Sequence, residues 1–325
     1  MEPKASSIRQ ENVLEFELGD ESLETDASNY VVPFEFGFKR DAPKVDIPPA
    51  QAQVIAIASG KGGTGKTTFT TNLAIALRKE GLRILIVDAD FGLANDHLLL
   101  GIEPHGDISD VLSGRMDIRD VLLPGPEGIH LLPGGMGSSH LSTMENYELQ
   151  ALARDIGSIE PDYDVILLDL SAGVSPQIMR FLKPAHDLII VTNPEVTALL
   201  DAYGLIKCLS NWNPDKQLEL QVVQNRVRTR EDSIASMQKL RRVVGKHLQS
   251  VKLNFLGYIP FDHYLLHSIA IQEPVVISHP RAFVTGCLKG IAQRIRSRYQ
   301  QWNRLQNTQT PYLSYFAQLE QQSYE

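Results

Sequence analysis

The chain has 325 residues, of which 43% are hydrophobic and 22% charged, a composition typical of soluble globular proteins. Its formal net charge of -8 excludes a generally basic surface, so any contact with DNA or anionic lipid must be a local patch. Cys208 and Cys287 lie far apart and form no disulfide framework or paired metal motif, which favours a reducing, cytoplasmic location. The polar N-terminus is not a secretory signal, and no apolar run is long enough to span a bilayer.

Residues 1–50 are rich in Glu, Asp, Ser and Pro, with short apolar clusters between them. This composition predicts an acidic, mostly disordered N-terminal arm, with or without a short docking element. We place a single folded domain at residues 51–302 and a polar C-terminal tail at 303–325.

Short continuous apolar runs begin at Val54 and indicate buried strands. They lie at residues 54–58, 84–87, 165–168, 188–191 and 218–223. Helix-length segments follow at 67–80, 145–157, 176–182, 196–210 and 231–248. Continuous apolar strands are typical of a parallel sheet covered on both faces. The alternation therefore predicts an α/β fold class, a doubly wound and mostly parallel sheet with helices on both faces.

A glycine-rich loop with the pattern G-x-x-x-x-G-K-[ST] lies between the first predicted strand and helix. Its glycines let backbone N–H groups point at phosphate oxygens, and the helix N-terminus adds its positive dipole end. Lys66 is predicted to neutralise the β- and γ-phosphates, Thr67 to bind Mg²⁺, and Thr68 to lie near the α-phosphate. The predicted nucleotide-binding residues are Gly60, Gly62, Gly63, Thr64, Gly65, Lys66, Thr67 and Thr68. A simple glycine turn is the alternative.

A second lysine, Lys61, lies near the start of the loop, where a standard P-loop does not require one. With it the loop resembles the deviant Walker A box, K-G-G-x-G-K-[ST], of the MinD/ParA family of P-loop NTPases. The resemblance implies that Lys61 reaches across a two-fold dimer to the phosphates of the second copy, so we expect an ATP-dependent homodimer. The alternative is a lysine that faces solvent.

Carboxylates follow two of the predicted strands. The segment D-A-D-F-G-L-A-N after the second strand resembles the first switch of the family. By this resemblance Asp90 orients the attacking water, and Asp88 supports the metal shell. Asp169 ends a later strand, as in a Walker B motif, and is expected to contact Mg²⁺ through water. A helix N-cap is the alternative for Asp169. The following Ser171-Ala-Gly resembles the second switch.

Polar residues at two later strand ends are expected to hold the base. These are Asn193, Asn225 and Arg226, at positions that contact the base in this family. The chain contains no N-K-x-D guanine motif, which favours ATP over GTP. The predicted cofactors are ATP and Mg²⁺, the predicted catalytic residues are Lys61, Lys66 and Asp90, and the predicted reaction is slow hydrolysis of ATP.

Residues 192–207 resemble the T-x-P-E-x-T-A-x-x-D-A-Y-x-x-I-K block of the FlhG branch of the family, also called FleN or YlxH. Residues 225–228 and 256–262 resemble the same branch. The resemblance implies a regulator of flagellar number or placement. Its implied partners are an FlhF-like GTPase, a flagellar switch or C-ring protein, or a flagellar transcriptional activator. The N-terminal arm lacks the D-Q-A-x-x-L-R segment with which many FlhG proteins stimulate FlhF.

Apolar residues at helical spacing, together with four cations, indicate an amphipathic helix from Phe283 to Trp302. Such a helix, with the aromatic stretch at 311–319, can bind an anionic membrane surface. We therefore expect residues 283–319 to support peripheral association with the inner face of the cell membrane or the cell pole. The alternatives are a helix that closes the domain and a tail that docks on it.

Three other interpretations are less favoured. A basic stretch at 226–246 permits DNA binding, but a solvated helix face with a loop that covers the adenine is the favoured explanation. His263 and His267 lack a third metal ligand, and the two cysteines do not fit an iron–sulfur site. Two function classes remain as alternatives to flagellar regulation, namely a ParA-like cargo or DNA-partitioning ATPase and a nucleotide-binding adaptor with little hydrolysis.

Overall fold

The computed structural model describes residues 51–91, 94–135, 144, 146–212 and 217–305. The chain divides into two units, Met1–Asp46 and Ile47–Glu325, and all described residues belong to the second. The arm predicted at 1–50 and the aromatic stretch at 311–319 therefore lie outside the described residues.

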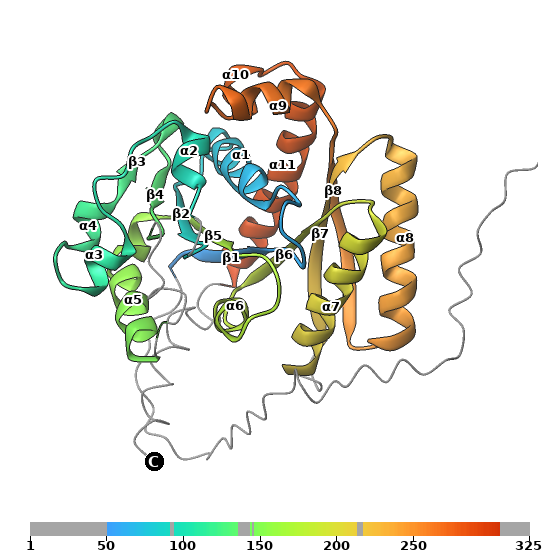
Figure 1. Ribbon diagram of the computed structural model, residues 1–325, viewed down its shortest axis with the longest axis horizontal. Coiled ribbons are helices and arrows are strands. Elements are labelled where there is room, and N and C mark those ends of the chain that lie inside the picture. The colour runs from blue at the N-terminus through green and yellow to red at the C-terminus, as the bar shows by residue number, and fades with distance from the viewer. Residues whose placement is uncertain (1–50, 92–93, 136–143, 145, 213–216, 306–325) are drawn as a thin grey trace, which may run out of the picture. The chain divides into compact units, whose positions relative to one another are not determined.

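The described strands form one sheet in the order β3-β4-β2-β5-β1-β6-β7-β8, shown in Figure 1. They are β1 (Gln53–Ala58), β2 (Ile84–Ala89), β3 (Leu123–Pro124), β4 (His130–Leu132), β5 (Val165–Leu170), β6 (Asp187–Thr192), β7 (Leu218–Val227) and β8 (Val251–Pro260). Only β3 and β4 pair antiparallel among them. Strands β2 to β5 lie on one side of β1 and strands β6 to β8 on the other. The carboxyl end of β1 is thus the topological switch point, where doubly wound folds bind ligands.

Helices cover both faces of this sheet (Figure 1). One face carries α1 (Lys66–Lys79), α2 (Asp96–Leu100), α9 (His263–Ala270), α10 (Val275–Ser278) and α11 (Phe283–Arg304). The other carries α3 (Ile108–Leu112), α4 (Ile118–Val121), α5 (Asn146–Ile159), α6 (Pro176–Leu182), α7 (Val196–Trp212) and α8 (Arg230–His247). Successive strand side chains point to opposite faces, so each apolar strand contributes to both cores. The predicted fold class is confirmed.

All five predicted strands and all five predicted helices are present, but β3, β4 and β8 were not predicted. Strand β8 is the longest of these three. It lies at the edge of the sheet, where exposed Lys252 and half-buried Asn254 interrupt its apolar pattern. Lys252 instead forms a 2.7 Å ion pair with Glu219 of the neighbouring β7. An edge strand that is solvated in part does not give the continuous apolar signal of a central strand.

Helix α11 closes the domain, as the alternative to a membrane-bound helix predicted, so its apolar side is not free to lie on a membrane surface. Its apolar side, which includes Leu288, Ile291 and Ile295, is buried in the core beside α1 and β8. Four of its cations bind the domain itself. Lys289 and Arg294 donate to the carbonyls of Pro280 and Leu256, while Arg296 and Arg298 pair with Glu80 and Asp187 at 2.9 and 2.8 Å. None of the helices in the described part of the chain has the length and apolar character to cross a bilayer.

Ile291→Ala is expected to lower the free energy of unfolding by about 2–5 kcal/mol, because it leaves a cavity in a packed core. Phe283→Ala, on the same helix but with the parent side chain 66% exposed, is the control and should change stability by less than about 0.5 kcal/mol. Urea denaturation of both variants measures the difference. Equal effects would contradict the buried position of α11.

Candidate nucleotide site

The glycine-rich loop joins the carboxyl end of β1 to the first residue of α1, at the topological switch point. Gly63 and Gly65 adopt the left-handed region, with φ of 75° and 86°, which favours glycine because it has no Cβ. A Cβ on Gly65 would also lie 2.2 Å from the amide nitrogen of Asn225. The sequence thus builds a tight loop that brings its backbone close to the end of β7.

Gly60 fixes the start of this loop against α7. A Cβ at this position would lie 2.1 Å from the backbone oxygen of Asp201, whereas a Cβ on Gly62 would meet nothing within 4 Å. Close backbone packing therefore requires glycine at position 60. At position 62 no neighbouring atom of a described residue excludes a larger side chain. The Gly60 contact joins the loop to the helix that begins inside the 192–207 block.

Lys66 and Asp169 form a buried ion pair at the centre of the site. Lys66 Nζ lies 3.1 Å from Asp169 Oδ1. The hydroxyls of Thr67 and Thr70 donate to the two oxygens of Asp169 at 2.7 and 2.9 Å. Burial opposes the charged form of Lys66, but the neighbouring Asp169 raises the pKa of the ammonium above its usual value. Ser175, and not Asp169, is the N-cap of the following helix α6, so the N-cap alternative for Asp169 is wrong.

Asp88 lies beside Asp169 in the register of neighbouring parallel strands. Its two oxygens accept the backbone N–H groups of Asp90 and Asp96, at 3.1 and 3.2 Å. Burial first, and then the charge of Asp169, raise the pKa of Asp88 to about 7. Asp88 therefore organises the turn after β2, and this turn holds Asp90 at the edge of the site, half-buried.

Asp96 is a site residue that the sequence analysis did not identify. Its side chain is 0% exposed, and burial, followed by Asp169 and Asp88, raises its pKa well above the usual value. The sequence position of Asp96 could have indicated its place in the site, because Asp96 directly follows the predicted first switch. This position was not recognised because an acidic residue at the start of a helix such as α2 is usually explained by its favourable interaction with the helix dipole.

These residues offer the oxygen ligands that Mg²⁺ prefers. The hydroxyl of Thr67 and the carboxylate of Asp169 lie together at the loop, with two more buried carboxylates beside them. Within the described ranges, no three His, Cys, Asp or Glu side chains are placed to hold a metal directly. Mg²⁺ commonly binds through one or two protein ligands, phosphate oxygens and water, so the site fits a hydrated Mg²⁺ that accompanies a nucleotide.

Lys61 does not join this cluster. Its Nζ lies 3.0 Å from the hydroxyl of Thr197 and 3.5 Å from Glu195 Oε2, at the start of α7. The Lys61 side chain is 41% exposed, whereas that of Lys66 is 7% exposed. The two lysines of one loop therefore occupy different environments, one at the surface and one at the buried carboxylates.

The residues predicted to hold the base are brought together at the ends of β6 and β7. Asn225 donates to the carbonyl of Thr64 at 2.7 Å and accepts the backbone N–H of Arg226 at 2.8 Å. Arg226 is exposed and has a φ of 54°, an uncommon value for a residue other than glycine. Asn193 is buried and accepts the N–H of Glu195 at 3.0 Å. Their contact with a base stays a prediction.

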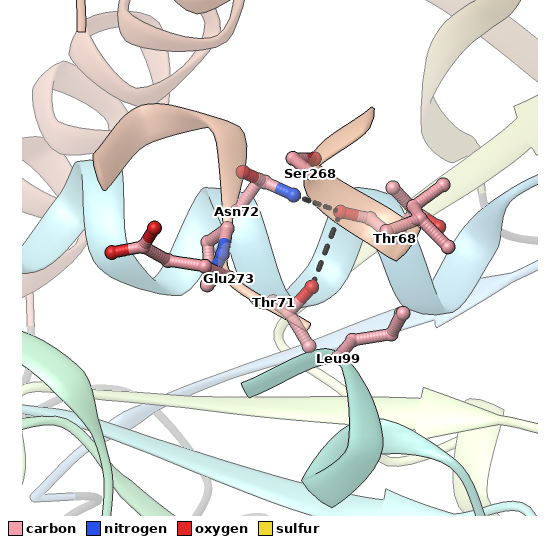
Figure 2. A pocket seen from close by; sticks show the side chains of 8 residues that line it. Thr68, Thr71, Asn72, Leu99, Ser268 and Glu273 are labelled. Carbon is pink, nitrogen blue, oxygen red and sulfur yellow. Dashed lines mark hydrogen bonds between the residues drawn. The ribbon is translucent and has the colours of Figure 1, made fainter. Parts of the chain in front are cut away.

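A small pocket lies beside the first two turns of α1, and Figure 2 shows its lining. Thr68, predicted to lie near the α-phosphate, lines it together with Leu99 of α2 and Ser268 of α9. The backbone oxygen of Thr68 accepts hydrogen bonds from Thr71 and Asn72 at 3.3 and 2.8 Å (Figure 2). Asn72 also accepts the N–H of Val276 at 3.3 Å, which ties the phosphate-loop helix to α10.

The comparisons with known proteins point to a nucleotide site. The family model described as CbiA, the CobQ/CobB/MinD/ParA nucleotide binding domain, matches residues 55–275. The chain is 35% identical over 249 residues to the antiactivator FleN of Pseudomonas aeruginosa, covering 75% of this chain and 86% of FleN. It is 33% identical to the flagellum site-determining protein YlxH of Helicobacter pylori, covering 63% and 68% of the two chains. The septum site-determining protein MinD of Pyrococcus horikoshii, solved with Mg-ADP, is similar with a TM-score of 0.61 and 27% identity, covering 75% and 96%.

Gly60→Ala is expected to lower the free energy of unfolding by about 1–3 kcal/mol, because its methyl group overlaps the α7 backbone. Gly62→Ala, in the same loop, is the matched control and should stay within about 0.5 kcal/mol of the parent. Denaturant unfolding without nucleotide compares the two. A Gly60→Ala protein as stable as the parent would show that the loop does not pack on α7 as described.

The raised pKa of Asp88 predicts a pH dependence of stability without metal or nucleotide. Because the folded-state pKa exceeds the unfolded one, the stabilisation is fully present below the unfolded value and is lost as the pH rises through about 7. Melting temperatures in EDTA should therefore fall from about pH 5 to pH 8, and Asp88→Asn should flatten this fall. Asp162→Asn removes a carboxylate that is 52% exposed and should leave the slope unchanged. Identical slopes in all three proteins would refute the assignment.

Proposed function

Because the chain belongs to the CobQ/CobB/MinD/ParA nucleotide-binding family, in its FleN and YlxH branch, we propose that it is an ATP-dependent monomer–dimer switch that regulates flagellar number or placement. Members of this family are ATPases. FleN is an antiactivator and YlxH is a flagellum site-determining protein, and these two relatives support the flagellar role.

The observation that supports the switch is the separation of the two lysines of the loop. Lys66 is buried on Asp169 within its own protomer, while Lys61 lies at the surface on Glu195 and Thr197. An exposed ion pair of this kind contributes only about 0–1 kcal/mol, so Lys61 is released from it at little cost. In a two-fold dimer it then reaches the phosphates of the second copy, where its charge stabilises a bound triphosphate.

The described side chains suit phosphoryl transfer to water by positioning and electrostatics. Lys66 and the loop N–H groups bind the phosphates, and Thr67 with Asp169 holds Mg²⁺. When bound, Mg²⁺ neutralises charge on the phosphate oxygens. Asp90, held by Asp88, orients the attacking water. A second protomer must supply Lys61 to complete the site, so turnover by the isolated chain is slow.

Flagellar proteins are the proposed partners of the dimer, whether an FlhF-like GTPase, a switch or C-ring protein, or a transcriptional activator. The names of FleN and YlxH support this class of partner. Peripheral binding to an anionic membrane belongs to the same proposal. Of residues 283–319, for which we predicted this binding, the aromatic stretch at 311–319 lies outside the described residues, and the apolar side of α11 is buried in the core.

Asp90→Ala is expected to bind ATP and to accumulate as a dimer, because it lacks the carboxylate that orients water. Lys66→Ala should stay monomeric with ATP, because it lacks the buried cation for the phosphates. Size-exclusion chromatography with light scattering measures both in the presence of ATP and of ADP. Lys239→Ala, an exposed lysine on α8, is the control and should behave as the parent. A parent oligomeric state that ignores nucleotide would contradict the switch.

A further inference from the structure

Asp96 is unusual among the site residues because its side chain is fully buried and its carboxylate oxygens accept no hydrogen bond from the described part of the chain. It begins α2, it is 0% exposed, and among the described residues neither of its carboxylate oxygens has a hydrogen-bond partner. Burying a carboxylate without partners is costly, so buried polar groups in folded proteins are almost always satisfied. An unsatisfied carboxylate at a binding site therefore indicates a group that becomes satisfied when the ligand is present.

The neighbours of Asp96 indicate the charge of that ligand. After burial, the charges of Asp169 and Asp88 are the largest effects that oppose ionisation of Asp96, and the charge of Lys66 favours it. Lys66 is already paired with Asp169. Three buried acidic side chains therefore lie around one buried ammonium, and this excess of acidic groups favours a cation of more than one charge.

The described side chains favour contact between Asp96 and a hydrated metal ion through water. No three acidic, His or Cys side chains within the described part of the chain are arranged as a direct metal site. Mg²⁺ dehydrates reluctantly and usually keeps several of its waters. Water bound to a metal is a hydrogen-bond donor, and the two oxygens of Asp96 are acceptors without donors.

We propose that Asp96 is a positioning residue that accepts hydrogen bonds from water in the hydration shell of Mg²⁺ and so makes nucleotide binding depend on the metal. This inference rests on the proposed Mg·ATP site and adds to it a fourth carboxylate, besides Asp88, Asp90 and Asp169. The Asp96 backbone N–H also binds Asp88, so the metal shell is linked to the turn after β2 and to the start of α2.

The test is the affinity for a fluorescent ADP analogue, measured in excess Mg²⁺ and in EDTA. Asp96→Asn and Asp96→Leu keep the shape of the side chain and remove its charge. Both should weaken binding about 10–100-fold in Mg²⁺, the usual effect of losing a group that orients metal ligands, and leave binding in EDTA unchanged. Asp187→Asn is the control, because Asp187 is also buried but is paired with Arg298. It should alter neither affinity.

An equal loss in Mg²⁺ and in EDTA, or no loss in either, would overturn the role of Asp96 and leave the proposed function intact. Failure of the parent protein to bind the nucleotide under both conditions would instead remove the proposed function itself. The nucleotide-free Asp96→Leu protein should melt no lower than the parent, because an apolar side chain replaces an unpaired carboxylate. Lower melting temperatures for both Asp96 variants would assign the carboxylate to the fold and overturn the proposal.

Discussion

The buried contact between Lys66 and Asp169 is the interaction on which the rest of the site depends. It joins the first residue of α1 to the end of β5, and Thr67 and Thr70 complete the hydrogen bonds of the carboxylate. Removing one partner of a buried ion pair typically costs about 3–5 kcal/mol, because the other charge is left uncompensated. A triphosphate that draws Lys66 away therefore leaves Asp169, Asp88 and Asp96 in need of a cation. Nucleotide and Mg²⁺ are expected to bind together for this electrostatic reason.

The same loop carries a second lysine, Lys61, which is weakly held and partly exposed, whereas Lys66 is buried. Lys61 is partly exposed and is held by one long ion pair and one hydroxyl, so few interactions oppose its movement. Lys66 is held in the interior by a buried ion pair, whereas Lys61 has little to retain it within its own protomer. This difference in burial gives the two lysines separate tasks. In the proposed switch, Lys66 binds nucleotide within its own protomer and Lys61 acts when a second copy arrives.

The central strands and the phosphate loop were predictable because local rules determine them. Buried parallel strands such as β1 and β5 are continuously apolar, and the loop needs glycine at positions where φ is positive. Edge strand β8 and short helices such as α2 have weak local sequence patterns, so their formation depends on tertiary packing. The amphipathic pattern of α11 was seen correctly, but it does not distinguish a protein core from a membrane surface. The role of Asp96 was not predicted for a related reason, because the burial of a carboxylate at a helix start depends on tertiary packing and is not visible in the sequence.

The most direct test of the account mixes two inactive proteins, Lys61→Ala and Asp90→Ala, and measures ATP hydrolysis by the mixture. If Lys61 acts across the dimer, the site of the Lys61→Ala protomer keeps its own Asp90 and receives Lys61 from the second chain. The mixture should then hydrolyse ATP well above the sum of its separate components. A mixture no more active than that sum would place the action of Lys61 within its own protomer and contradict the account.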